Sequence, residues 1–317
     1  IGTFSFDIKQ PLKIRATLWE NYVLGVVFGL QKKCPNQLGG FECNISSELP
    51  IGAGISSSAA LECGVAKGLN HLFDLNLSDI ELIEISRMAE HNFVGTKCGV
   101  MDQFAVTMGQ NNKLLLLNCE SLKYQLIDAD FSPYKIILLN SNVSHNLASS
   151  KYNIRRAECE QALRIIQEQH PNFDFLANVP ETIIKSLKGK LPEKIYQRAL
   201  YVSRENARTL KAASLMQEGK IEDFGELMYQ THKGLSKNYE VSCPELDFLV
   251  DLTFDLPQVL GSRMMGGGFG GCTINLVKED FVQSLMDMAE QQYKKQFGIA
   301  LTSILVETSN GVEITNY

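Results

Sequence analysis

The segment PIGAGISSSAALE, from Pro50 to Glu62, restricts the fold most, because two glycines and three serines lead directly into a helix-forming run. A flexible linker would not be followed by an amphipathic helix. A buried helix cap needs only one serine. A third interpretation is an anion-binding loop, in which glycines let backbone N–H groups turn inward at the positive end of a helix. The residues alone leave the cap and the anion-binding loop open as alternatives.

A second glycine-rich segment, RMMGGGFGGCTINLV, begins at Arg263. Its Gly266, Gly268 and Gly271 match the GxGxxG spacing of dinucleotide-binding turns, but a strand-like run follows where that fold has a helix. We therefore reject a dinucleotide site. The segment is either a turn where backbones pack closely, beside a solvated Arg263, or a second backbone wall over the first loop.

Composition excludes several classes of function. A net charge of -6 argues against a nucleic-acid groove, which must neutralise phosphates, although a small phosphorylated ligand remains compatible. No apolar run reaches the ~18 residues of a membrane span, so we expect no membrane partner. The eight cysteines form no CxxC pair and the five histidines form no metal-binding pair. This pattern is typical of a reduced, cytoplasmic protein without a histidine metal site.

Helices and strands alternate without a strict βαβ rhythm, which predicts an α+β fold. Helical spacing covers residues 18–33, 61–72, 78–93, 151–169 and a hairpin over 193–237 that breaks near Gly219. Strand-like runs cover residues 40–46, 113–119, 135–142, 270–277 and 301–314. We place a domain boundary near residues 128–133, between an N-terminal lobe of residues 1–130 and a C-terminal lobe of residues 131–317.

Local patterns add detail to these elements. Ser78 and Glu81 form a capping-box pattern, and Asn310–Gly311 suggests a tight turn. Arg155 and Arg156 are expected on a solvated helix face. Two buried helical stripes are expected: Leu61, Val65, Leu69 and Leu72 in one helix, and Leu82, Ile85, Ala89 and Phe93 in the next.

Five blocks of the chain resemble the GHMP kinases, a family that phosphorylates small sugars and isoprenoid precursors. PIGAGISSSAALE resembles their phosphate-binding motif, and GSRMMGGGFGGCTINLV resembles their C-terminal glycine motif. EHNFVGTKCGVMDQFAVTMGQ, NSNVSHNLASSKYNIRRAECE and NYEVSCPELD are similar to the galactokinase branch in particular. The resemblance runs from about Trp19 to Val277 and keeps the order of the blocks.

The resemblance implies a two-lobed GHMP kinase fold, with a phosphate loop in the N-terminal lobe and a ferredoxin-like C-terminal lobe. It implies transfer of the ATP γ-phosphate to the C1 hydroxyl of galactose, with Mg²⁺ as cofactor and ATP as co-substrate. Separately from the resemblance, we expect a monomer. A kinase for N-acetylgalactosamine or another pyranose is an alternative. So is a galactose and ATP sensor without turnover, although such sensors are expected to lose part of the stretch from Ser56 to Ala60, which is intact here.

The resemblance also assigns roles to single residues. Asp102 matches the catalytic aspartate, which contacts the sugar and accepts or orients its C1 hydroxyl proton. Ser58 and Glu90 match the Mg²⁺ ligands, and Gly99 and Tyr152 match sugar contacts. The expected ATP-binding residues are the loop Gly52, Ala53, Gly54, Ile55, Ser56, Ser57 and Ser58, with the aromatic pair Trp19 and Tyr22 near adenine.

One motif of the family does not occur in the chain. Galactokinases carry an N-terminal motif of the type GRxNLxGEHTDYxGG, whose arginine steadies the transferring phosphate and whose Glu, His and Asp bind the sugar. Nothing in residues 1–40 replaces it. Because the internal motifs are intact, we expect the natural protein to carry this motif before residue 1.

Overall fold

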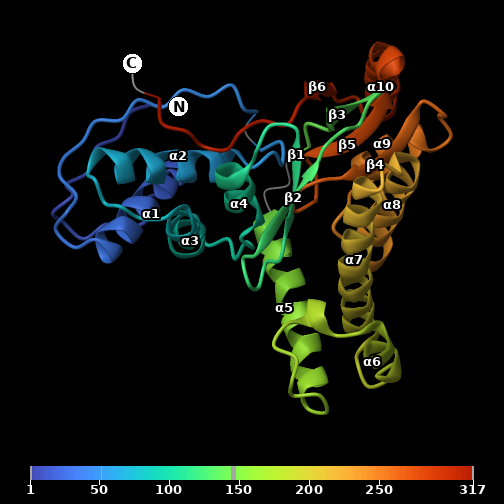
Figure 1. Ribbon diagram of the computed structural model, residues 1–317, viewed down its shortest axis with the longest axis horizontal. Helices are drawn as coiled ribbons and strands as arrows, with labels where there is room; N and C mark the ends of the chain where they lie inside the picture. The colour runs from blue at the N-terminus through green and yellow to red at the C-terminus, as the bar shows by residue number, and fades with distance from the viewer. Residues whose placement is uncertain (1, 51, 144–147, 316–317) are drawn as a thin grey trace. The chain divides into compact units, whose positions relative to one another are not determined.

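The computed structural model describes residues 2–50, 52–143 and 148–315, and the chain forms two compact units (Figure 1). Unit 1 comprises Ile1–Ile51, Ser56–Leu126 and Thr308–Tyr317. Unit 2 comprises Gly52–Ile55 and Ile127–Glu307. Each unit is therefore built from separate stretches of sequence.

Unit 1 is mainly helical. Its helices are α1 (Leu18–Lys33), α2 (Ser57–Leu72), α3 (Asp79–Ala89) and α4 (Met101–Met108), and β1 (Lys113–Leu117) pairs with β2 (Tyr124–Asp128). The predicted helices and the strand at 113–119 are confirmed. Helices α1, α2 and α3 pack around one apolar cluster, whose buried members include Val26, Val27, Leu30, Val65, Leu69, Leu82 and Ile85.

The predicted capping box begins α3. The Ser78 hydroxyl accepts from the Glu81 backbone N–H at 3.4 Å, and Glu81 Oε2 accepts from the Ser78 backbone N–H at 2.9 Å. The buried stripe from Leu82 to Phe93 is also confirmed. The stripe in α2 is confirmed only in part: Leu72 is 58% exposed, because the helix ends there.

Two local predictions in unit 1 are wrong. Residues 40–46 form no strand: Phe41 packs its ring against Phe6 and Phe73, but Cys43 and Ile45, the other apolar members of the alternation, are exposed. Asn310–Gly311 forms no tight turn. The Gly311 N–H instead donates to Gly109 O at 2.8 Å, and a Cβ at Gly311 would lie 2.3 Å from Thr107 O. This glycine permits close approach to the end of α4.

Unit 2 contains a four-stranded antiparallel sheet of β3 (Tyr134–Asn140), β4 (Val259–Met264), β5 (Cys272–Lys278) and β6 (Thr302–Val306). The strand order is β4-β5-β3-β6. Helices separate β3 from β4 and β5 from β6, whereas β4 leads directly into β5. This β-α-β-β-α-β arrangement is ferredoxin-like, as expected.

The helices of unit 2 are α5 (Ala148–Gln167), α6 (Glu181–Ser186), α7 (Glu193–Gln217), α8 (Ile221–Gly234), α9 (Pro244–Phe254) and α10 (Val282–Phe297). Helix α5 and the α7–α8 hairpin, which breaks at Gly219, are confirmed. Helix α8 packs very closely on β4, since a Cβ at Gly225 would lie 2.3 Å from Leu260 O. None of the helices in the described ranges has both the length and the apolarity that a bilayer-spanning helix needs.

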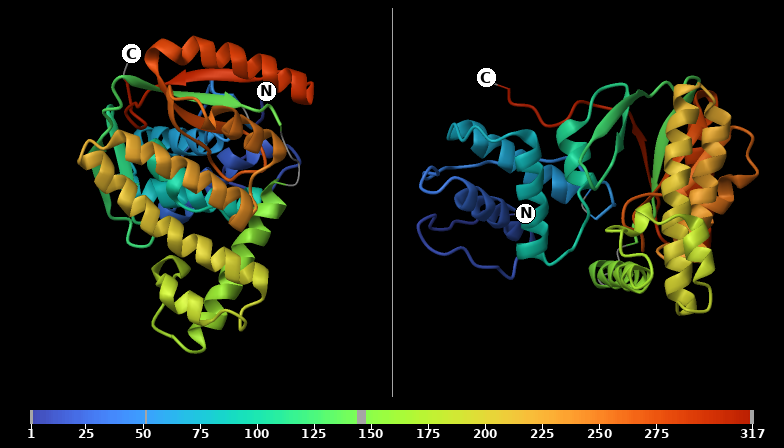
Figure 2. Two further views of the ribbon diagram at one scale, coloured as in Figure 1. Left: turned by 90° about the vertical axis from the view of Figure 1, so that its right-hand side faces the viewer. Right: turned by 60° about the horizontal axis from the view of Figure 1, so that its bottom comes forward.

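The two faces of the sheet in unit 2 have different neighbours. One face presents Ile137 and Leu139 to α9 and α10 (Figure 2, α10 in red). The opposite face presents Leu138, which packs with Ala53 and Ile55 of the segment that precedes α2. The sheet therefore supports Gly52–Ile55, the glycine part of the segment that the sequence singled out.

Candidate active site

The predicted phosphate loop alternates between exposed glycines and anchored side chains. Gly52 and Gly54 have left-handed backbones, with φ of 77° and 73°, which L-residues adopt only with strain. Ala53 is 2% exposed, and both Ala53 and Ile55 pack on the sheet of unit 2. The side chains thus hold the loop while the backbone at the glycines stays exposed, as a backbone anion site requires.

The second glycine segment, Met265–Gly271, lies directly against this loop within unit 2. A Cβ at Gly271 would be 2.9 Å from Ala53 O, and a Cβ at Gly266 would be 3.0 Å from Gly54 O. The segment joins β4 to β5, so a strand follows it and the rejection of a dinucleotide turn is confirmed. We call Met265–Gly271 the glycine wall. Arg263, which is solvated in only one of the two interpretations of this segment, is half-buried and donates to Met264 O at 3.0 Å.

Asp102 lies in the first turn of α4, in unit 1. Burial raises the pKa of its carboxyl, and a hydrogen bond with the Ser56 side chain opposes that rise. Ser56 occupies the N-cap position of α2 with a left-handed φ of 59°, and its side chain makes no capping bond. The first serine of the motif is therefore directed to the predicted catalytic carboxylate rather than to its own helix.

Glu90 lies at the end of α3, where the chain widens into a π-helical segment, Glu90–Val94. Such segments often occur at functional sites. The Glu90 side chain is 7% exposed, and this burial is the main cause that raises its pKa. A hydrogen bond with Ser58 lowers the pKa, and the charge of Asp102 raises it. The structure thus brings together Ser58 and Glu90, the two predicted Mg²⁺ ligands, with Asp102 nearby.

These oxygens do not form a complete metal cage. Among the residues that the structure describes, no group of three or more His, Cys, Asp or Glu side chains is arranged to hold a metal ion. Mg²⁺ commonly binds through one or two protein oxygens together with substrate phosphates and water. A hydroxyl and a buried carboxylate fit that requirement, so the donor set suits a cation that arrives with ATP.

Glu62 is a residue that the sequence analysis missed. It is fully buried in α2, and Gln103 Nε2 donates to its Oε2 at 3.2 Å. Burial, followed by the charge of Glu90, raises the pKa of Glu62 to about 9. Glu62 Oε1 and Gln103 Oε1 are both buried without a hydrogen-bond partner in the described part of the chain. A proton on Glu62 would supply the missing donor, because a carboxylic acid and an amide can pair through two hydrogen bonds.

The predicted adenine and sugar contacts lie at different places. In unit 1, Trp19 packs edge-on against Phe4, with ring centroids 4.9 Å apart. Burial is the main cause that raises the pKa of Tyr22, and the charges of the nearby Glu90 and Glu62 raise it further. In the same unit Gly99 is exposed, and a Cβ there would meet no atom within 4 Å. Neither packing nor φ requires a glycine at that position. The predicted contact with the sugar is therefore still the one explanation offered for this glycine.

Tyr152 belongs to unit 2, where it lies on α5 beside the glycine wall. A Cβ at Gly267 would be 3.5 Å from Tyr152 Cδ2. On the same helix Arg155 is not solvated as expected: its side chain is 16% exposed and pairs with Glu158 at 2.8 Å. Arg156 lies on the solvated face and pairs with Glu160 at 3.0 Å.

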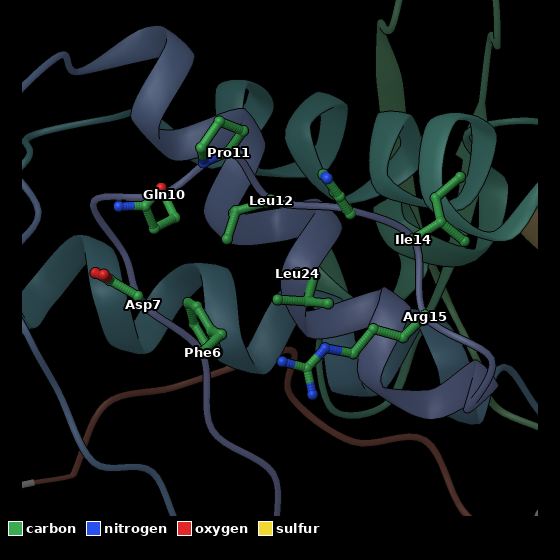
Figure 3. A pocket seen from close by; sticks show the side chains of 9 residues that line it. Phe6, Asp7, Gln10, Pro11, Leu12, Ile14, Arg15 and Leu24 are labelled. Atoms are coloured by element: carbon green, nitrogen blue, oxygen red, sulfur yellow. The ribbon is translucent and has the colours of Figure 1, made fainter.

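A pocket in unit 1 contains none of the predicted site residues (Figure 3). It is lined by residues 6–7 and 10–15 together with Leu24 of α1. Its Arg15 forms an ion pair with Glu20 at 2.9 Å and lies over the Phe4 ring. These contacts explain the position of Arg15: it holds the segment before α1 against the rest of unit 1.

Two family models match separate parts of the chain, and relatives match nearly all of it. The GHMP kinases N terminal domain matches residues 21–110, and the GHMP kinases C terminal domain matches residues 212–295. The galactokinase of Thermosipho africanus is 38% identical over 313 residues, which cover 98% of this chain and 86% of the relative. The galactokinase of Clostridium acetobutylicum is 37% identical over 317 residues, which cover 100% of this chain and 81% of the relative.

A solved structure confirms the predicted fold. The crystal structure of Lactococcus lactis galactokinase complexed with galactose matches with a TM-score of 0.88 and 32% identity. The match covers 97% of this chain and 79% of that one. The α+β, two-lobed GHMP kinase fold with a ferredoxin-like sheet is therefore established. The chain belongs to the galactokinases, a branch of the GHMP kinase family.

Proposed function

We propose that this galactokinase transfers the γ-phosphate of ATP to the C1 hydroxyl of galactose, and that Asp102 accepts or orients the proton of that hydroxyl. The observation that carries the role of Asp102 is its environment. Burial raises the pKa of the carboxyl toward a range useful for a base, while the Ser56 hydrogen bond favours the ionised form that can accept a proton. The galactose bound to the Lactococcus lactis relative supports galactose as the sugar.

Positioning and charge stabilisation dominate phosphoryl transfer, so the remaining residues are proposed to hold the reactants. The backbone of Gly52–Ile55 and the hydroxyls of Ser56, Ser57 and Ser58 would bind the ATP phosphates. The exposed glycine backbone and its support by the sheet favour this assignment. Trp19 and Tyr22 remain proposed adenine contacts, and Gly99 and Tyr152 remain proposed sugar contacts.

Ser58 and Glu90 would hold Mg²⁺. The hydrogen bond between these two side chains supports this assignment, and both offer the hard oxygen ligands that Mg²⁺ prefers. When bound, the cation would neutralise charge on the phosphates. It would also offset the like charge of Asp102, which after burial is one of the causes that raise the pKa of Glu90.

We further infer a cytoplasmic monomer. All eight cysteines are free thiols, and Cys34, Cys63, Cys243 and Cys272 are buried, which suits a reducing compartment. Light scattering coupled to size-exclusion chromatography tests the monomer, since a dimer would double the 35.3 kDa mass of the chain.

The activity is tested by ADP release with galactose, N-acetylgalactosamine and other pyranoses as acceptors. Galactose is expected to give the highest kcat/KM. Asp102→Asn should lose turnover and keep ATP affinity, whereas Asp251→Asn, an exposed carboxylate on α9, is the matched control and should change neither. Tight binding of galactose and ATP without ADP release would contradict the kinase assignment and favour a sensor. Preference for another sugar would contradict galactose as the substrate but not the kinase assignment.

A further inference from the structure

His232 lies in the last turn of α8, in unit 2, and is 5% exposed. Its Nδ1 accepts the backbone N–H of Met264 at 3.1 Å. A nitrogen that accepts a hydrogen bond carries no proton, so a neutral ring has its proton on Nε2. Nε2 lies 3.1 Å from Asp247 Oδ1. Both of these atoms are buried, so a proton on Nε2 that faces Oδ1 gives a donor and an acceptor to each other where water cannot reach them.

Asp247 is held ionised beside the imidazole. It lies in α9, near the helix N-terminus, and its Oδ2 accepts from the Ser236 hydroxyl at 2.8 Å. Burial tends to raise the pKa of Asp247, but hydrogen bonds with His232, Ser242 and Ser236 outweigh burial and bring the pKa below its usual range. A carboxylate at this position fixes both the tautomer and the orientation of the ring.

The N–H that His232 binds belongs to an edge strand. β4 has β5 as its one neighbour in the sheet, so its outer N–H groups need acceptors from elsewhere. Met264 is the last residue of β4, and the glycine wall begins at the next residue. The Met265 N–H donates to Cys272 O at 3.1 Å, which closes the base of the wall. His232 therefore binds the chain at the point where it leaves the sheet.

We propose that His232 is a positioning residue of the nucleotide site, which acts by holding Met264 and thereby the glycine wall against the phosphate loop. The inference rests on the proposed role of Gly52–Ser58 in binding ATP. The wall touches the loop by backbone contact at Gly266 and Gly271, so a shift at Met264 is passed to the loop without a flexible side chain between them. Asp247 contributes by orienting the ring.

Two substitutions separate the two hydrogen bonds of the ring. In His232→Asn the amide oxygen lies near the former position of Nδ1 and can still accept from the Met264 N–H. The asparagine side chain is too short to reach Asp247. The amide of His232→Gln extends toward the position of Nε2 and can donate to Asp247, but it leaves the Met264 N–H without its acceptor. We expect His232→Gln to raise the Kd of MgATP about tenfold, the scale of a buried donor left unpaired. We expect His232→Asn to stay within about threefold of wild type.

The binding of MgATP to the full chain is measured by isothermal titration calorimetry, together with KM for galactose and kcat at saturating ATP. The proposal requires that galactose KM and kcat change less than about twofold in both variants, because only nucleotide binding is affected. Equal effects of the two variants, or a change in galactose KM as large as that in ATP affinity, would overturn it. If His232→Gln does not fold, Asp247→Asn takes its place, with an expected smaller rise in the Kd of MgATP and an unchanged galactose KM. An unchanged Kd of MgATP in Asp247→Asn would then overturn the proposal.

Gly54→Val distinguishes this inference from the proposed function beneath it. A valine at a φ of 73° is strained and narrows the approach to the loop backbone. If a folded Gly54→Val protein binds MgATP normally, the phosphate-loop assignment fails. If Gly54→Val loses MgATP binding while His232→Gln keeps it, the proposed role of His232 is refuted and the phosphate-loop assignment stands.

Discussion

Replacing Glu62 with glutamine removes a buried ionisable group without changing the shape of the side chain. In the wild type, Gln103 Nε2 donates to Glu62 Oε2, and a proton on Glu62 would let Oε1 donate to Gln103 Oε1. A glutamine amide can replace both interactions, accepting through its oxygen and donating through its nitrogen. The substitution therefore keeps the link between α2 and α4 and removes only the titration.

The pKa of Glu62 sets the size and the sign of the effect. It is about 9 in the folded protein, against an ordinary value of 4.5. Between these pH values the unfolded chain loses the proton and the folded chain keeps it, so the free energy of unfolding of the wild type falls as pH rises. The slope is at most about 1.4 kcal/mol per pH unit, or about 3 kcal/mol between pH 5.5 and 7.5. In the Glu62→Gln protein this contribution to the pH dependence of the free energy of unfolding is absent.

Urea unfolding at pH 5.5, 6.5 and 7.5, without Mg²⁺ or nucleotide, measures the difference between the two proteins. We expect Glu62→Gln to gain about 2–3 kcal/mol relative to wild type from the lowest to the highest pH. Glu222→Gln, an exposed glutamate on α8, is the control and should follow the wild type at each pH. A difference that does not change with pH would refute the reasoning, because Glu62 would then be ionised in the folded protein.

Three further predictions concern catalysis, the metal site and packing. Asp102→Asn should lower kcat by roughly 10²-fold or more while the Kd of ATP changes only a few-fold, as rapid-quench single turnovers and calorimetry can show; parallel losses would make Asp102 structural. Ser58→Ala combined with Glu90→Gln should raise the Mg²⁺ concentration for half-maximal activity by roughly 10-fold or more, and an unchanged Mg²⁺ titration would remove both residues from the metal site. Gly225→Ala should destabilise the protein by roughly 1–3 kcal/mol in urea unfolding, because its Cβ would lie 2.3 Å from Leu260 O; wild-type stability would mean that α8 moves freely on β4.

The parts of the fold that the sequence predicted depend on local patterns. The capping box at Ser78 needs only residues within one turn, and the hairpin break at Gly219 needs a left-handed residue, with an observed φ of 69°. The errors arise where a local pattern has a distant cause. Gly311 looks like a turn residue, but its lack of a side chain serves an approach to Thr107 O, which no local pattern reveals.

The candidate site shows the same division. The motifs indicated Ser58, Glu90 and Asp102, and the structure brings their side chains together in unit 1. The pairing of Glu62 with Gln103 was missed because each residue looks like an ordinary polar position on its own helix. A signal did exist for Glu62: it shares a buried face of α2 with Ala59 and Cys63, where a charge is expensive. The pairing of His232 with Met264 and Asp247 had no comparable signal, since it joins a helix, a strand edge and a second helix.

The order of β4-β5-β3-β6 has a consequence for synthesis on the ribosome. Strand β3 ends at Asn140, but both of its neighbours, β5 and β6, are made only after residue 271. Its two edges thus stay unpaired while most of unit 2 is translated, and unpaired edges invite association between nascent chains. Unit 1 also needs a late segment of the chain, because the Gly311 N–H donates to Gly109 O within this unit. Both units need residues from the last part of the chain, so we expect late folding and a dependence on chaperones that shield β3 during translation.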